Sequence, residues 1–94
     1  MLKIKDNVDL KELEKYGYSI DLHLNQASKK INLGFDKYGD LHSILILIKD
    51  NIIRFKHEIN FYVGYSSNFI EFGFFNRRKY LKDLIKADLV EKVD

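Results

Sequence analysis

The stretch LHSILILIKDNIIRFKHEI, residues 41–59, decides the fold of this chain. Residues 41–48 become apolar at every position towards their end, which is typical of a central strand buried on both faces of a sheet. A turn signal at 49–51 is followed by a regular alternation of apolar and polar residues over 52–65. These fourteen residues exceed the usual strand length, so we expect a bend, a bulge or two strands.

The alternation over 52–65 assigns side chains to two faces of this strand. We expect the polar set to be a solvated face, or alternatively a recognition surface, since Arg and Tyr often anchor protein interfaces. One face carries Ile53, Phe55, His57, Ile59, Phe61, Val63 and Tyr65, and the other carries Ile52, Arg54, Lys56, Glu58, Asn60 and Tyr62.

Further strands are predicted by the same alternation over 18–25, 31–36 and 69–75. A loop is expected at 26–30, and a turn at 66–68. In the last of these strands, the alternation directs Ile70, Phe72 and Phe74 into the core.

A short helix near the amino terminus has clear start and stop signals. Asp9 is the expected N-cap, with Glu12 placed to complete a capping box. Gly17 supplies the left-handed residue that ends the helix. Leu10 and Leu13 are expected to face the core.

The carboxyl-terminal part reads as a helix over 77–87 with Asn76 as its N-cap. Asp88 is the expected left-handed stop, and residues 89–93 form a short strand that pairs with the segment at 2–5. We therefore predict one α+β domain over residues 1–94: a mainly antiparallel sheet of four to six strands with a short helix near each terminus.

Composition excludes several classes of function. The chain has 94 residues, a net charge of +2 and no cysteine, which excludes disulfides and thiolate zinc sites. The charge is weaker than that of a typical DNA-binding domain. The chain begins without the apolar region of a secretory signal, and its apolar run at 44–48 is too short to span a bilayer. We expect a soluble cytoplasmic protein with no membrane partner.

No catalytic or cofactor motif is evident. His23 and His42 are predicted on separate strands without a metal-ligand neighbour, and His57 lies in a third segment. Asp36 and Asp40 bracket a turn, where we expect both carboxyl groups to be solvated. The glycines form no phosphate-binding pattern. We therefore expect no enzyme activity, no cofactor and no metal.

A basic cluster, Arg77, Arg78 and Lys79, follows an aromatic-rich stretch. Positive charge in the first turn of a helix opposes the helix dipole, which favours a role in contacting a partner. Nucleic acid is a second candidate partner, and a sheet edge could pair two copies of the chain. The candidate partner-binding residues are Arg54, Lys56, Tyr62, Asn76, Arg77, Arg78, Lys79 and Lys82.

The two ends of the chain, KIKDNVDLKELEKYGY (3–18) and LKDLIKADLVEKV (81–93), resemble those of small accessory proteins encoded by phages and prophages of low-GC Gram-positive bacteria. This chain has Asp88 where the family pattern has Gly. The resemblance implies a mobile-element protein inside a bacterial cell, a setting in which inhibitors of host defence, including anti-CRISPR proteins, are common. We expect a non-enzymatic inhibitor of a host defence protein such as a CRISPR effector; the alternative is a nucleic-acid-binding regulatory protein.

Overall fold

A computed structural model describes residues 1–61, 64–70 and 74–93, and for residues 74 and 75 it describes the backbone alone. The expectation of a mainly antiparallel sheet is confirmed, but within these residues the sheet has seven strands instead of four to six. The strands are β1 (Leu2–Ile4), β2 (Ser19–Asp21), β3 (Gln26–Phe35), β4 (Leu41–Lys49), β5 (Ile52–Phe61), β6 (Gly64–Ile70) and β7 (Val90–Lys92). The helices are the 3₁₀-helix η1 (Leu10–Tyr16) and the α-helices α1 (Phe74–Tyr80) and α2 (Lys82–Lys86).

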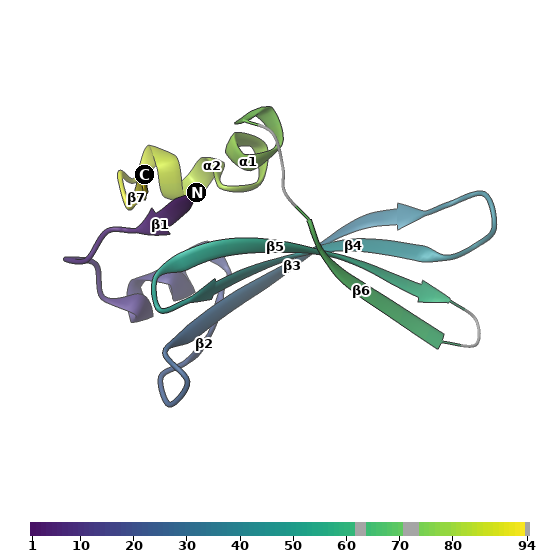
Figure 1. Ribbon diagram of the computed structural model, residues 1–94, viewed down its shortest axis with the longest axis horizontal. Helices are drawn as coiled ribbons and strands as arrows, with labels where there is room; N and C mark the ends of the chain where they lie inside the picture. Colours follow the sequence, from purple (N-terminus) through teal and green to yellow (C-terminus); the bar gives the residue numbers. More distant parts are fainter. Residues whose placement is uncertain (62–63, 71–73, 94) are drawn as a thin grey trace.

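Strands β2 to β5 follow one another in the sheet as antiparallel neighbours (Figure 1). The outer edge of β5 is shared by two strands, because β1 pairs with its first residues and β6 pairs with the remainder. Beyond β1 lies β7, with Leu2 opposite Lys92 and Ile4 opposite Val90. The predicted pairing of the two ends of the chain is thus confirmed.

The core lies on one face of the sheet, which we call the covered face. Ile44, Ile46 and Ile48 alternate along β4 and are buried there, as sequence alternation requires. Each such side chain contributes about 1.5–3 kcal/mol through its burial. The remaining buried members of this cluster are Ile4, Leu10, Leu13, Tyr18, Ala27, Ile53, Phe55, Leu81 and Leu84.

The helices gather at one end of the molecule, and the paired strands extend away from them (Figure 1). The molecule is accordingly elongated, with principal extents of 44 × 30 × 23 Å. The far ends of β3, β4, β5 and β6 form an arm, at the end of which Phe35 and Tyr65 are exposed. None of the described helices has the length and apolar character needed to cross a bilayer.

Two sequence predictions in the first half are corrected. The strand expected over 18–25 ends at Asp21, because the chain turns there: Asp21 Oδ1 accepts the Leu24 amide at 3.2 Å, and Asn25 has φ 51°. Leu22 and Leu24 continue the apolar alternation but lie exposed in this turn. The loop expected at 26–30 is the first half of β3, paired with both β2 and β4.

The segment 52–65, for which we expected a bend, a bulge or two strands, contains two strands: β5 ends at Phe61 and β6 begins at Gly64. The turn expected at 66–68 is wrong: these residues pair with His57–Ile59 inside β6. Of the strand expected over 69–75, residues 69 and 70 belong to β6, residues 74 and 75 begin α1, and 71–73 lie outside the described residues.

Helix α1 begins two residues before Asn76, so Asn76 lies inside it and is not its N-cap. Ile70 packs against the core as predicted. The inward orientation predicted for Phe72 lies outside the described residues, as does that of the Phe74 side chain.

The predicted start and stop of the first helix and the left-handed stop at Asp88 are confirmed. Asp9 caps η1 by accepting the Lys11 amide at 3.0 Å, and Gly17 ends it with φ 87°. The tighter 3₁₀ form replaces the expected α-helix, and Leu10 and Leu13 are still buried. At the other end of the chain, Asp88 adopts the left-handed conformation with φ 59°.

Candidate partner-binding site

The side of the sheet opposite the core carries the intervening residues of the same strands, and we call it the open face. Ser43, Leu45 and Leu47 of β4 alternate with the core isoleucines and therefore lie on it. Leu45 and Leu47 are half-buried and do not belong to the core cluster. The buried side chains of the described helices all join the cluster on the covered face. Apolar residues of the open face are thus available for contact.

Two cations of the open face lie over one aromatic ring. The Arg54 guanidinium is 3.5 Å from the centroid of the Phe69 ring, and the Lys56 ammonium is 4.6 Å from it. The register explains both contacts. Lys56 lies directly opposite Phe69, and Arg54 precedes Lys56 by two residues on β5 and therefore lies on the same face. Each cation–π contact contributes about 0.5–1 kcal/mol at an exposed site. The ring therefore holds both side chains in place while their charges remain at the surface.

A hollow of about 730 Å³ opens beside Arg54. It forms because Arg54 lies between the part of β5 that pairs with β1 and the part that pairs with β6. Helix α1 contributes Arg77 to the hollow from its other side. The lining consists of Met1, Leu2, Ile53, Arg54, Phe55, Phe69, Ile70 and Arg77.

Arg77 and Leu2 line both this hollow and a second one of about 300 Å³. Arg77 contributes the charged group. The Nε atom of Arg77 is buried and has no hydrogen-bond partner in the part of the chain that the structure describes. An unsatisfied buried donor costs about 1–3 kcal/mol. The second hollow is lined by Leu2, Arg77, Arg78, Ile85, Val90, Glu91 and Lys92.

The expectation that the polar side of β5 is fully solvated is wrong for Glu58. Its side chain is only 5% exposed and forms an ion pair with Lys30 at 3.1 Å. Its cross-strand neighbour Ser43 is also buried and donates to Asn32 at 3.0 Å. Sequence alternation alone could not reveal this, because the Lys30 ammonium reaches Glu58 across an intervening strand. The polar centre of the open face is therefore internally paired. Arg54 and Lys56 lie beside it on β5, towards the end of that strand that pairs with β1.

The structure unites some of the predicted partner-binding residues and separates others. Arg54, Lys56 and Arg77 meet around Phe69 and the larger hollow. Arg78 lines only the smaller hollow. The remaining predicted residues are not among those that line either hollow: Asn76 is exposed on α1, Lys79 lies over the Tyr80 ring, Lys82 is exposed at the start of α2, and Tyr62 lies outside the described residues.

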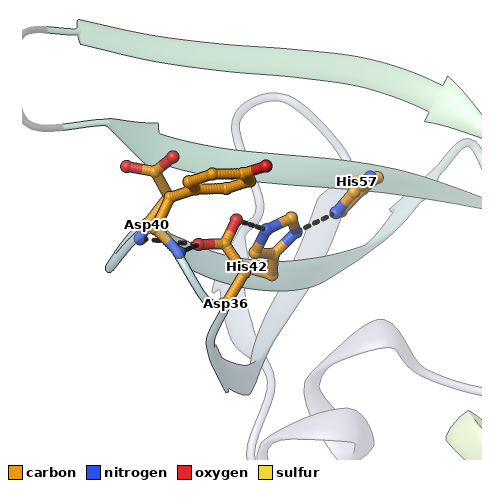
Figure 2. Close-up of polar contacts among 5 residues, drawn as sticks. Asp36, Asp40, His42 and His57 are labelled. Carbon is orange, nitrogen blue, oxygen red and sulfur yellow. Dashed lines mark hydrogen bonds and ion pairs between the residues drawn. The ribbon is translucent and has the colours of Figure 1, made fainter.

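A second cluster, at the far end of the sheet, was missed by the sequence predictions. His42 lies between a carboxylate and a second imidazole: its Nε2 is 2.8 Å from Asp36 Oδ2, and its Nδ1 is 2.9 Å from His57 Nε2 (Figure 2). The prediction that His42 has no acidic or histidine neighbour is wrong, and so is the prediction of a merely solvated Asp36. The hydrogen bond with His42, aided by the amides of Asp40 and Tyr38, lowers the pKa of Asp36.

The comparisons with known proteins give no relatives on which to draw. No protein-family model matches this chain, and no curated protein or solved structure is significantly similar to it. Function is therefore inferred from the site itself.

Proposed function

We propose that this chain is a small non-enzymatic binding protein that recognises an acidic segment of a partner protein. The open face with Arg54, Lys56 and Phe69, together with the adjoining hollow that contains Arg77, is the binding surface. The observation that carries the proposal is the convergence of Arg54 and Arg77, from a strand and a helix, on one hollow of about 730 Å³.

The chemistry of these groups favours a carboxylate. Arginine presents a planar fork of donors that pairs with a carboxylate through two hydrogen bonds. No ion pair is found for Arg54, Lys56 or Arg77 within the described residues. The lysines that do form ion pairs there are Lys3, Lys5, Lys29 and Lys30. Leu45 and Leu47 supply apolar contact beside these charges, and a mixed surface of this kind is typical of a protein interface.

The proposed setting follows from the resemblance of both chain ends to phage and prophage accessory proteins. In that setting the chain acts in the bacterial cytoplasm, and the partner is a host defence protein such as a CRISPR effector. Recognition through an acidic surface of the effector needs no nucleic-acid mimicry. The outer edge of β6 is a further surface at which a second copy of the chain could pair.

The experiment measures inhibition and binding together. The chain is expressed in cells whose CRISPR effector targets a phage, and restored plaque formation is the expected result. Binding of the purified chain to that effector is then measured by calorimetry. The variant Arg54→Glu/Arg77→Glu is expected to weaken binding at least tenfold, because it places two negative charges against an acidic partner. Lys11→Glu/Lys15→Glu changes the net charge equally at exposed positions of η1 and is expected to leave binding unchanged.

Two outcomes count against the proposal. Equal losses of affinity in both double variants would mean that net charge, and not the hollow, determines binding. Failure of the wild-type chain to bind or inhibit any effector of a broad panel would remove the proposed class of partner.

A nucleic-acid-binding regulatory protein is the second candidate. It is favoured by exposed Phe69 beside Arg54 and Lys56, and by Tyr65, which is exposed farther along β6, because aromatic rings and cations together bind single strands. Against it, the guanidinium of Arg54 already occupies one face of the Phe69 ring. This candidate requires an affinity for single-stranded DNA or RNA that falls steeply with salt. A salt-insensitive or absent gel shift would eliminate it.

A further inference from the structure

Strand β6 presents an open edge to its surroundings. Within the described residues it pairs with β5 alone, and it is the outermost strand on its side of the arm (Figure 1). The backbone N–H and C=O groups along such an edge are a template for one more strand. Natural proteins protect their edges with charged residues, proline, bulges or very short strands, because an unprotected edge pairs with another chain.

The other outer edges of the sheet are protected in these ways. β2 and β7 have only three residues each, and both contain charged side chains. The part of β3 that extends beyond β2 contains Lys29 and Lys30, and its register with β4 shifts between Asn32 and Gly34. By contrast, β6 has seven residues, GYSSNFI, without a charge, a proline or a shift in register. The edge of β6 is therefore the long unprotected edge of the described sheet.

We propose that two copies of this chain form a symmetric dimer by antiparallel pairing of β6 with β6. A two-fold axis pairs all seven residues only where it passes through the middle residue, Ser67. Tyr65 then lies opposite Phe69 of the partner subunit, and Gly64 lies opposite Ile70 of the partner subunit. The two sheets thereby become one continuous sheet.

The side chains of β6 suit this register. Tyr65 and Phe69 are 59% and 46% exposed on the open face, and aromatic side chains that lie opposite each other stabilise antiparallel strands. No described atom lies within 4 Å of a Cβ built on Gly64, which leaves room for Ile70 of the partner subunit. The Ser67 hydroxyl is buried without a hydrogen-bond partner among the described residues. In the dimer it faces Ser67 of the partner subunit, and hydroxyl side chains in such cross-strand pairs form hydrogen bonds.

The pairing keeps the positive charges of the two open faces apart. The register of β5 with β6 places Lys56 and Lys56 of the partner subunit three strand spacings and four residues from each other. With strands about 4.8 Å apart and a rise of about 3.4 Å per residue, this separation is about 20 Å. It exceeds the Debye length of about 8 Å at physiological salt, so these charges do not oppose the dimer. Self-association does not require the acidic partner proposed above, and its tests are independent of that partner.

The first test measures the mass of the full chain in solution. Seven residues a side are fewer than the roughly 20–30 of a standard interface, so we expect a dimer that dissociates on dilution. Sedimentation velocity over a hundredfold range of concentration is expected to show this exchange. Ser66→Lys/Asn68→Lys protects the edge of β6 with charge and should weaken association at least tenfold. Leu33→Lys/Phe35→Lys adds the same charge at exposed positions of β3 and should leave association unchanged.

Two results of that measurement overturn the proposal. A monomer at every concentration would mean that the edge of β6 does not bind a second copy. Equal losses in both double variants would mean that net charge or the apolar end of the arm, and not β6, determines association.

A cross-linking test reports the register directly. The chain has no cysteine, so Ser67→Cys introduces its single thiol. Residues directly opposite in antiparallel strands have Cα atoms about 4.5–5.5 Å apart, within the range that a disulfide requires, so mild oxidation with diamide should link the two chains. Tyr65→Cys is the matched control, because its two copies lie about 14 Å apart in the proposed register and should not be linked. Equal linking of both variants, or linking of Tyr65→Cys alone, would show that the pairing is not centred on Ser67.

Discussion

The covered and open faces of this sheet are built from the same strands but obtain their burial by different means. On the covered face, Ile46 and Ile48 are wholly buried by side chains from distant helices. On the open face, Glu58 and Ser43 are equally shielded, yet by side chains of neighbouring strands and by the Lys30 ion pair. The difference indicates that the covered face supplies most of the stability, because the described helices pack only on that side.

The largest expected difference is between adjacent residues of β4. Ile46→Ala opens a cavity in the core and is expected to lower the free energy of unfolding by about 2–5 kcal/mol. Leu45→Ala, on the open face, should cost roughly 1 kcal/mol because its half-buried side chain already contacts water. Urea denaturation of both variants measures the two costs. Equal losses would show that the open face is covered in solution.

The next effect concerns the ion pair at the centre of the open face. Lys30→Met keeps the aliphatic stem but leaves the buried Glu58 carboxylate unpaired, so we expect a loss of about 1–3 kcal/mol. Lys49→Met, at an exposed position of β4, is the matched control and should change stability by less than about 0.5 kcal/mol.

The double variant Lys30→Met/Glu58→Gln separates pairing from packing. It should recover part of the loss, since no buried charge remains. A double-mutant cycle in urea gives the coupling free energy of the pair. A coupling energy near zero would mean that the pair contributes nothing to the shielding of this face.

These contrasts also show where sequence reasoning succeeded. The apolar run over 41–48 and the alternation over 52–61 predicted both strands, because period-two patterning reflects burial. They left open which face of the sheet is covered, since the run in the first strand is apolar on both faces. Caps at Asp9, Gly17 and Asp88 were predictable because each depends on the local backbone. The β2–β3 hairpin was not, since apolar residues continue through its turn and hide it.

The candidate sites divide in the same way. Arg54 and Arg77 were predictable as candidate partner-binding cations, but their shared hollow depends on how two strands divide the edge of β5. The contact between His42 and His57 depends on the register of β4 with β5, and that with Asp36 depends on the turn between β3 and β4. Neither the register nor the geometry of the turn follows from the order of residues alone.

A smaller effect is expected at the exit of α2, which packs on the covered face. Asp88 holds a left-handed conformation that costs a non-glycine residue roughly 1–2 kcal/mol, partly recovered for Asp. The Asp88 carboxylate forms an ion pair with Lys5 at 2.9 Å, but the Asp88 side chain is 87% exposed, so this pair contributes little to stability.

Asp88→Gly should therefore stabilise the chain by up to about 1 kcal/mol, measured as a higher urea midpoint with an unchanged slope. Gly17→Ala is the converse variant: it places a side chain at φ 87° and should destabilise by about 1 kcal/mol. A destabilising Asp88→Gly would show that the ion pair with Lys5 outweighs the backbone strain.

The smallest effect tests the far end of the covered face, beyond the helices, where Asp36 and His42 meet. Hydrogen bonds from His42, and then from the Asp40 and Tyr38 amides, hold the pKa of folded Asp36 below its unfolded value of about 3.9. Since the unfolded chain takes up this proton first, the contribution of Asp36 is present above about pH 4 and is lost as pH falls through the folded pKa. Asp36→Asn should thus lower the melting temperature at pH 6 and converge with the wild type near pH 2. Parallel curves over that range would mean that the carboxylate contributes no net stability, and that His42 is oriented by the sheet alone.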